Sequence, residues 1–246
     1  MKRKTKIILI TIPTVVFIGI IIGSLIFLSQ SYKPMEETII ALESDTKVTV
    51  TSTKDWITFS PVNFTSSTGF IFYPGGNVEA ESYSIVARGI AEEGFFVGII
   101  KMPFDLAVFS PKKAAKMIEA FPEVNSWIIG GHSLGGSMAA NYVYNSPEKI
   151  NGLIFLASYP ASSNDLSVSN ISVLSIYGSR DGILSKPINE TTTLLPTNTI
   201  YVEIVGGNHA YFGSYGEQKG DLQATISRSE QQQITIDEIT NFISNI

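Results

Sequence analysis

Short runs of apolar, β-branched residues alternate along most of the chain with segments whose apolar residues recur at helical spacing. Two of these runs, residues 127–129 and 153–156, are apolar without a break, which is typical of strands buried on both faces of a parallel sheet. Strands that alternate with helices indicate crossover units, in which a helix covers the sheet between two parallel strands. The pattern predicts an α/β fold with a mostly parallel central sheet and helices on both faces.

The individual elements follow from where each pattern starts and stops. We predict strands over residues 47–52, 56–59, 69–73, 95–101, 126–129, 152–157, 173–177 and 199–205. We predict helices over residues 79–93, 111–121, 134–145, 186–195 and 228–246. No internal repeat or low-complexity run interrupts this order, so we expect a single domain over residues 46–246.

The amino-terminal stretch follows a different pattern. Residues 7–28 contain no charged side chain, and 22 helical residues at about 1.5 Å each would cross the roughly 30 Å hydrocarbon layer of a bilayer. Four basic residues precede this run, and the acidic Glu36 and Glu37 follow it, which places the amino terminus in the cytoplasm by the positive-inside rule. The sequence therefore predicts a cytoplasmic tip and transmembrane anchor over residues 1–29, a polar stalk over 30–45, and a catalytic domain outside the cell.

A cleaved signal peptide is the alternative for this stretch, and it would give a secreted protein. The apolar part of a signal peptide usually spans about 7–15 residues and ends at a site of small residues. The run here is longer and no Ala-x-Ala site follows it. These features favour an uncleaved anchor and a single-pass protein of the cell membrane.

Charge and cysteine content narrow the chemistry. Without the four basic residues before the apolar run, the chain carries 13 basic and 22 acidic residues, a formal charge of −9. Nucleic acids and anionic surfaces are bound by clustered lysine and arginine, so neither is an expected partner. The chain has no cysteine, which excludes thiol nucleophiles, disulfides and cysteine-based zinc sites.

The strongest chemical motif is Gly131-His132-Ser133-Leu134-Gly135, between the predicted strand 126–129 and the predicted helix 134–145. G-x-S-x-G at a strand-to-helix turn presents a strained, exposed serine hydroxyl, and its glycines leave room where a β-carbon would collide. We therefore predict Ser133 as a nucleophile. The backbone N–H of Leu134, at the start of the helix, is the expected first donor to an oxyanion.

A serine needs a base to accept its proton, and the chain has only two histidines. The side chain of His132 would point away from Ser133, its neighbour in the turn. His209 follows the predicted strand 199–205 and so lies at the carboxyl edge of the sheet, where active sites of open α/β sheets gather. We predict His209 as the general base.

The histidine in turn needs a carboxylate that orients it. The acidic residues between Ser133 and His209 are Glu148, Asp165, Asp181, Glu190 and Glu203. Only Asp181 leaves an apolar strand for a glycine-flanked turn, so we predict it as the third member. Aspartate followed by glycine is also favoured in turns for structural reasons alone.

These residues and their chain order resemble the α/β-hydrolase superfamily. Over residues 48–246 the chain is similar to the compact serine hydrolases grouped with dienelactone-hydrolase-like proteins, although dienelactone hydrolases use a cysteine nucleophile that is absent here. The resemblance implies the fold and the triad roles of Ser133, Asp181 and His209. Residues 74–77 resemble the family's His-Gly-x-Gly segment with Pro74 in place of the histidine, which makes Gly76 the expected second oxyanion donor.

The expected activity is hydrolysis of carboxylic esters or related acyl bonds, in small-molecule or lipid-like substrates, through an acyl-enzyme. No cofactor or metal is expected, because two histidines without an H-E-x-x-H pattern make a zinc site improbable. Two alternatives stay open: an acyltransferase that uses the same triad, and a catalytically silent surface protein that only binds. The glycine-containing segment 210–226, after the histidine, is expected to fold over the site as a partial lid.

Overall fold

A computed structural model gives the structure of residues 19, 23, 31–63 and 66–246. The chain divides into two units, Met1–Ser31 and Tyr32–Ile246. Among the residues so described, no helix has both the length and the hydropathy to cross a bilayer. The run predicted as a transmembrane helix, residues 7–28, lies outside the described residues except for Gly19 and Gly23, so it stays a prediction.

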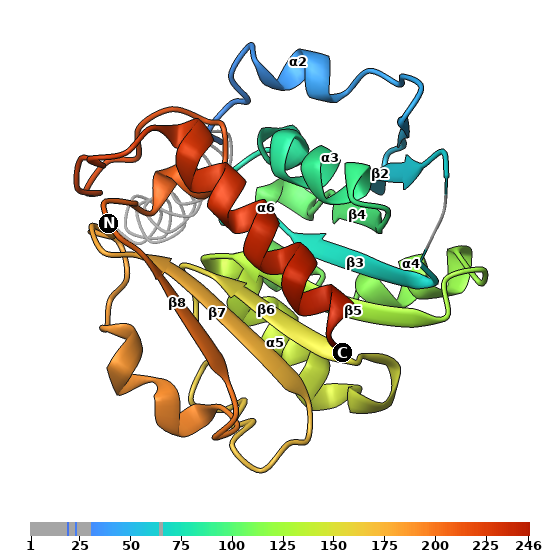
Figure 1. Ribbon diagram of the computed structural model, residues 1–246. Coiled ribbons are helices and arrows are strands. Elements are labelled where there is room, and N and C mark those ends of the chain that lie inside the picture. The colour runs from blue at the N-terminus through green and yellow to red at the C-terminus, as the bar shows by residue number, and fades with distance from the viewer. Residues whose placement is uncertain (1–18, 20–22, 24–30, 64–65) are drawn as a thin grey trace, which may run out of the picture. The chain divides into compact units, whose positions relative to one another are not determined.

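One eight-stranded sheet organises the larger unit, in the order β1-β2-β4-β3-β5-β6-β7-β8 (Figure 1). Its strands are β1 (Val48–Ser52), β2 (Trp56–Pro61), β3 (Thr68–Tyr73), β4 (Phe96–Ile100), β5 (Ser126–His132), β6 (Gly152–Leu156), β7 (Ser172–Gly178) and β8 (Ile200–Ile204). The pairs β1–β2 and β2–β4 are antiparallel, and all other pairs are parallel. All eight predicted strands, and the mostly parallel α/β sheet, are confirmed.

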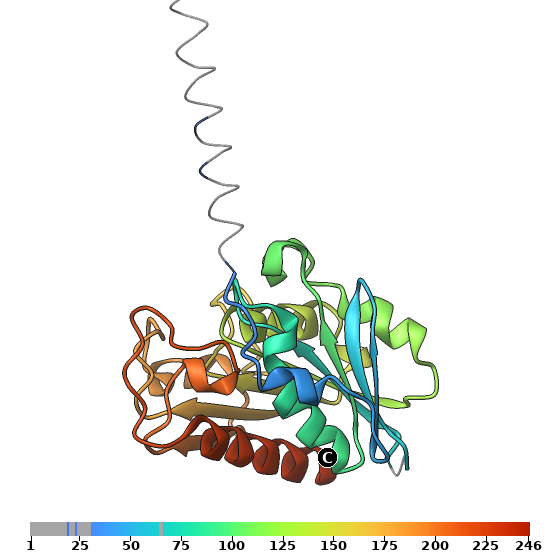
Figure 2. The same ribbon diagram turned by 90° about the horizontal axis from the view of Figure 1, so that it is seen from above.

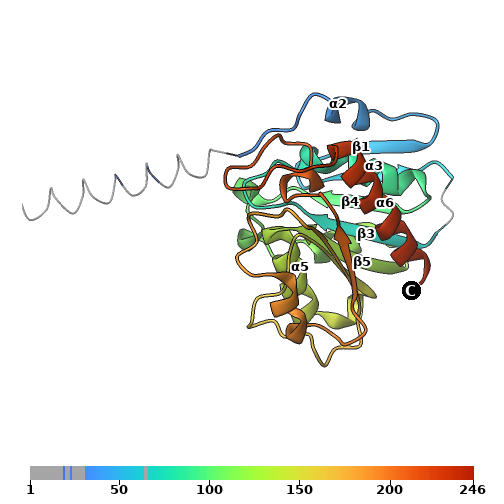
Figure 3. The same cartoon turned by 60° about the vertical axis from the view of Figure 1, so that its left-hand side comes forward.

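Helices cover both faces of this sheet. They are α3 (Ser84–Glu92), α4 (Ala114–Ala120), α5 (Leu134–Asn145) and α6 (Arg228–Ser244). Side chains of β3 alternate between two cores, since Phe70 and Phe72 pack with residues of α3 and α6, whereas Ile71 and Tyr73 pack with residues of α4 and α5. Figure 3 shows α3 and α6 on one side of the sheet and α5 on the other. Both faces of the central strands are thus apolar, which explains their unbroken apolar sequence.

Two of the predicted helices differ from the structure. No α-helix forms over residues 186–195, where two short 3-10 turns occur instead, η5 (Ile188–Glu190) and η6 (Thr192–Leu194). Three consecutive threonines begin at Thr191, and β-branched residues are poor helix formers. The Thr191 hydroxyl also donates to the Ile188 carbonyl oxygen at 2.7 Å, so it competes with the backbone N–H groups of a helix for that oxygen. The helix predicted over residues 79–93 begins with a 3-10 turn, η1 (Ala80–Tyr83), that leads into α3.

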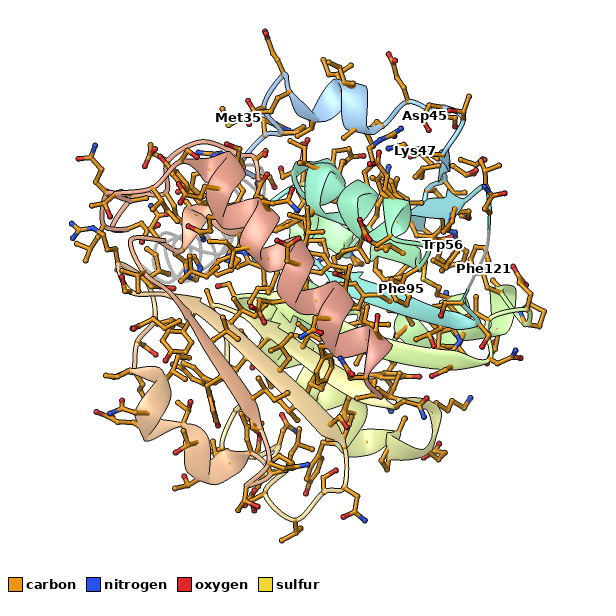
Figure 4. The ribbon with its side chains drawn as sticks, viewed as in Figure 1. Met35, Asp45, Lys47, Trp56, Phe95 and Phe121 are labelled. Carbon is orange, nitrogen blue, oxygen red and sulfur yellow. The ribbon has the colours of Figure 1, made fainter. Side chains whose placement is uncertain are left out.

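The segment before β1, predicted as part of a stalk, packs against the body from Tyr32 onward. It contains a short helix, α2 (Thr38–Ala41), whose Thr38 and Ala41 are buried. Figure 4 labels Met35 and Asp45 towards the two ends of the segment, and both are tied to the body: Met35 N–H donates to the Ser214 carbonyl oxygen at 2.8 Å, and Asp45 pairs with Arg88 at 2.6 Å. The few buried residues of this segment follow no helical or strand periodicity. Its polar composition therefore led to the prediction of a spacer.

Candidate active site

Ser133 occupies the turn that joins the end of β5 directly to the start of α5. Its backbone has φ 52° and ψ −122°, a left-handed conformation that costs a non-glycine residue of order 1–3 kcal/mol. A β-carbon at Gly131 would lie 2.5 Å from the Tyr73 carbonyl oxygen, and one at Gly135 would collide with the same oxygen. The flanking glycines are therefore required by the close approach of the end of β3, as the motif predicts.

The carbonyl side of this turn is held by Ser158, a residue that no sequence motif singles out. The Ser158 hydroxyl, just after β6, donates to the Ser133 carbonyl oxygen at 2.6 Å. The Ser133 N–H donates to the Leu156 carbonyl oxygen at 3.0 Å. Both bonds tie the strained turn to the carboxyl end of β6 and fix its direction.

His209 and Asp181 meet at the same edge of the sheet, from the loops after β8 and β7. The Nδ1 atom of His209 lies 2.8 Å from Oδ2 of Asp181, and both side chains are almost fully buried. The other carboxylate oxygen, Oδ1, accepts the N–H groups of Ile183 and Leu184 at 2.8 and 2.9 Å. Because Asp181 accepts on both oxygens, Nδ1 carries the proton and the Nε2 atom of His209 is left as an acceptor.

Ser133 and His209 line one pocket of about 280 Å³. The His209 Nε2 atom is buried and makes no hydrogen bond to any described residue. Apolar side chains also line the pocket, among them Leu134, Ile183 and Leu184. The arrangement offers an oriented imidazole, with a free acceptor nitrogen, in the same cavity as the serine of the turn.

The two residues predicted as oxyanion donors lie against each other. A β-carbon at Gly76 would be 3.0 Å from Cδ2 of Leu134. Leu134 is the first residue of α5, so its N–H has no acceptor within the helix. The Gly76 N–H has no acceptor in the part of the chain that the structure describes. The two residues are thus neighbours, and neither N–H group has a backbone acceptor among the described residues.

His132, the other histidine, is buried beneath the site and packs on His209, with 4.5 Å between their ring centroids. Its Nδ1 atom is 2.8 Å from the Tyr83 hydroxyl, and the Gly75 N–H donates to that hydroxyl oxygen at 3.0 Å. Burial, and then the neighbouring His209, hold the pKa of His132 well below its usual range. The neutral ring therefore accepts a hydrogen bond from the Tyr83 hydroxyl. The buried hydrogen bonds from Gly75 to Tyr83 and from Tyr83 to His132 connect the loop of Gly76 to the ring that packs on His209.

Sequence reasoning missed this connection. Tyr83 lies within a predicted helix, where a tyrosine suggests ordinary core packing, and nothing in the local pattern places it beside the serine turn. Burial also raises the pKa of the Tyr83 hydroxyl, which stays protonated and can donate. Only the fold brings the two residues together.

The segment 210–226 does not close over the pocket as expected for a lid. No residue of this segment is among those that line the pocket. Phe212 and Tyr215 are buried in the core, and Asp221 accepts the N–H groups of Ala210 and Gly182 at 2.8 and 2.9 Å. The aromatic side chains of the segment are thus part of the core, and Asp221 binds the loops that carry His209 and Asp181.

A metal site is not apparent in residues 31–63 and 66–246. No group of three or more histidine, aspartate or glutamate side chains there gathers closely enough to hold an ion. The Asp181 carboxylate, which pairs with His209, also accepts from two backbone N–H groups.

Comparison with known proteins agrees with the fold. Residues 69–233 match the model of a family described as "Alpha/beta hydrolase family". No curated protein matches the chain. Among solved structures, a predicted CIB-like hydrolase from Thermoplasma acidophilum is 17% identical, with a TM-score of 0.56 over 79% of this chain and 98% of that one. A membrane phospholipase A, described as a novel bacterial virulence factor, is 12% identical, with a TM-score of 0.60 over 99% of this chain and 98% of that one. At these identities the two likenesses show the fold alone.

Proposed function

The chain belongs to the alpha/beta hydrolase family, and from that premise we propose that it is a serine hydrolase of carboxylic esters or related acyl bonds. Ser133 is the nucleophile, His209 the general base, and Asp181 the residue that orients the histidine. The observation that carries the proposal is the pairing of His209 Nδ1 with Asp181, which leaves a buried, unpartnered Nε2 in the pocket that Ser133 lines.

The reaction begins when the Ser133 hydroxyl oxygen attacks the carbonyl carbon of the substrate and its proton passes to Nε2 of His209. The Asp181 carboxylate stabilises the imidazolium that forms. The N–H groups of Leu134 and Gly76 donate to the oxyanion of the tetrahedral intermediate. The intermediate collapses as His209 returns the proton to the leaving alcohol, and an acyl group stays on Ser133.

Water completes the cycle. His209 removes a proton from a water molecule that attacks the acyl carbonyl, and the second tetrahedral intermediate releases the acid and free Ser133. The apolar lining from Leu134, Ile183 and Leu184 supports an acyl chain as the group bound there. A small-molecule or lipid-like ester is thus the proposed substrate class.

A fluorophosphonate probe tests the nucleophile. The native protein should be labelled covalently, and Ser133→Ala should not be. Ser137 is a matched control, because it lines the same pocket on the first turn of α5. We expect Ser137→Ala to be labelled. If both variants lose labelling, or if both keep it, the result contradicts the proposed role of Ser133.

Product analysis separates hydrolysis from transfer. With a chromogenic ester and added alcohol or amine, hydrolysis gives the free acid, whereas an acyltransferase gives the new ester or amide. We expect the acid to be the main product at moderate acceptor concentration. A predominantly transferred product would assign the same triad to acyl transfer.

We also propose that residues 7–28 anchor the protein in the cell membrane, with the catalytic unit outside. The support is the uncharged run and the basic residues before it. The protein should resist extraction by alkaline carbonate, and protease added to intact cells should digest the catalytic unit. An amino terminus that begins after residue 28 in the mature protein would show instead that the run is a cleaved signal.

A further inference from the structure

The loop after β4 presents large apolar side chains to solvent. Residues 103–109, which we call the aromatic loop, form two short 3-10 turns, η2 (Pro103–Asp105) and η3 (Ala107–Phe109). Phe104, Val108 and Phe109 are 57%, 46% and 55% exposed, and the two phenylalanine rings lie 5.7 Å apart at their centroids. Phe104 and Asp105 both have positive φ, at 55° and 53°. Grouped exposure of large apolar side chains marks a surface that contacts something other than water.

The aromatic loop adjoins the rim of the proposed site. The Asn77 N–H donates to the Asp105 carbonyl oxygen at 2.9 Å. Leu106, in the middle of the loop, has its Cδ2 atom 3.5 Å from where a β-carbon would stand on Gly76. The exposed phenylalanines are therefore connected, through residues in direct contact, to the expected oxyanion donor.

The start of the catalytic unit meets the same residue. The Tyr32 N–H donates to the Asn77 carbonyl oxygen at 2.7 Å, and the Glu79 N–H donates to the Tyr32 carbonyl oxygen at 3.1 Å. Asn77 is thus bonded to the first residue of the unit on its carbonyl side and to the aromatic loop on its amide side. Figure 2 shows the segment that begins at Tyr32, in blue, and the green loop after β4 at the same edge of the body.

The length of chain before Tyr32 limits how far this edge can be from a membrane. The uncharged run ends at Leu28, four residues before Tyr32. At no more than about 3.6 Å per residue, four residues span about 14 Å. A protein anchored through residues 7–28 therefore carries Asn77 and its neighbours close to the bilayer surface.

We propose that Phe104, Val108 and Phe109 form a bilayer-contact surface, which holds the mouth of the site against the membrane that anchors the protein, and that the substrates are acyl lipids of that membrane. Aromatic and aliphatic side chains partition into the boundary between headgroups and acyl chains. The formal charge of −9 beyond the anchor makes the contact apolar rather than electrostatic, so it suits zwitterionic lipid and does not depend on salt. The lipid substrate rests on the proposed hydrolase function, and the contact rests on the proposed anchor.

Site-directed labelling tests the contact, because the chain has no cysteine of its own. The full chain carrying Val108→Cys, labelled with an environment-sensitive nitrobenzoxadiazole dye, is reconstituted into phosphatidylcholine vesicles. Val168→Cys is the matched control, a valine that is 94% exposed shortly before β7. Doxyl groups on the lipid chains should quench the dye at residue 108 at least about threefold more than at residue 168, at low and high salt.

Two other outcomes overturn the contact. Equal quenching at the two positions means that the aromatic loop does not touch lipid. The emission of the dye at residue 108 could instead shift to the blue with increasing protein concentration and not respond to doxyl lipid. That result would mean that a second copy of the chain covers the loop. Hydrolysis measured on the same labelled protein, with native Ser133, keeps the two proposals apart, since a quenched dye without ester hydrolysis leaves the contact in place and removes only the hydrolase.

A kinetic split tests the substrate class. In the full-chain variant with Phe104→Ser, Val108→Ser and Phe109→Ser, hydrolysis of vesicle phospholipid should fall at least about tenfold more than hydrolysis of a soluble short-chain ester. An equal fall on both substrates would show damage to the site itself and contradict an interfacial role. Native protein that hydrolyses the soluble ester but no lipid in vesicles would refute acyl lipids as substrates and leave the proposed hydrolase standing.

Discussion

Replacing Asp181 by asparagine should nearly abolish activity while leaving the fold intact. The two N–H groups of Ile183 and Leu184 point at Oδ1 from 2.8 and 2.9 Å, so the amide oxygen of an asparagine must occupy that place. The amide nitrogen then takes the position of Oδ2, 2.8 Å from Nδ1 of His209, and donates to it. His209 is forced into the tautomer with its proton on Nε2, which can no longer accept the proton of Ser133.

The magnitude follows from the loss of the base. A wrong tautomer at this position in a serine triad costs about 10⁴ in kcat, or about 5.5 kcal/mol of transition-state stabilisation. The assay is the kcat/KM of a chromogenic ester, measured beside the thermal unfolding midpoint of each protein. A variant that keeps its fold and a rate within about tenfold of the native value would refute the proposed role of Asp181.

Asp221→Asn is the matched control for the same chemical change. Asp221 accepts from Gly182 on one oxygen and from Ala210 on the other, and it makes no hydrogen bond to the His209 imidazole. An asparagine there turns its NH₂ towards one of these N–H groups, which costs about 1–3 kcal/mol of stability. We expect Asp221→Asn to lower the unfolding midpoint more than Asp181→Asn does, and to lower kcat far less.

Three further predictions concern the turn and the buried bonds beneath it. Gly135→Ala should destabilise the fold by about 2–4 kcal/mol in urea unfolding, because its β-carbon meets the backbone oxygens of Tyr73 and Pro74; a loss below about 1 kcal/mol would mean that the turn opens freely. Tyr83→Phe should cost about 1–3 kcal/mol, since it leaves the Gly75 N–H and the His132 ring without partners, whereas Tyr144→Phe, at a half-exposed position, should change stability by less than about 0.5 kcal/mol. The folded protein holds the pKa of His132 below its unfolded value of 6.5, so at low pH the unfolded state binds an extra proton. The free energy of unfolding should therefore be highest above about pH 6.5 and decrease as the pH falls below that value, with a slope of up to about 1.4 kcal/mol per pH unit. The variant His132→Gln should flatten this slope.

The sequence predicted those parts of the fold in which local pattern and tertiary environment agree. The strands β3, β5 and β6 were predictable because they are buried on both faces and are therefore mostly apolar. The serine turn was predictable because the collisions at Gly131 and Gly135 restrict these positions to glycine. In both cases a single steric or burial requirement acts on residues that are neighbours in the sequence, so a short stretch of sequence is enough to reveal it.

Features that depend on distant segments were not predictable. The helix expected over residues 186–195 fails because threonine hydroxyls compete for backbone groups, which an apolar period does not reveal. The bond between Tyr83 and His132 joins residues 49 positions apart, and the attachment of Tyr32 to Asn77 joins two loops. The expected lid was wrong because the length of segment 210–226 suggested a flap, while Phe212 and Tyr215 are buried in the core.

Trapping the acyl-enzyme tests whether Ser133 is the nucleophile. Rapid acid quench after mixing with a slowly hydrolysed ester, followed by peptide mass spectrometry, reports where the acyl group is attached. We expect about one acyl group per protein molecule, on Ser133, formed in a burst together with the leaving alcohol. An acyl group on another residue, or steady ester hydrolysis with no covalent intermediate on Ser133, would contradict this expectation.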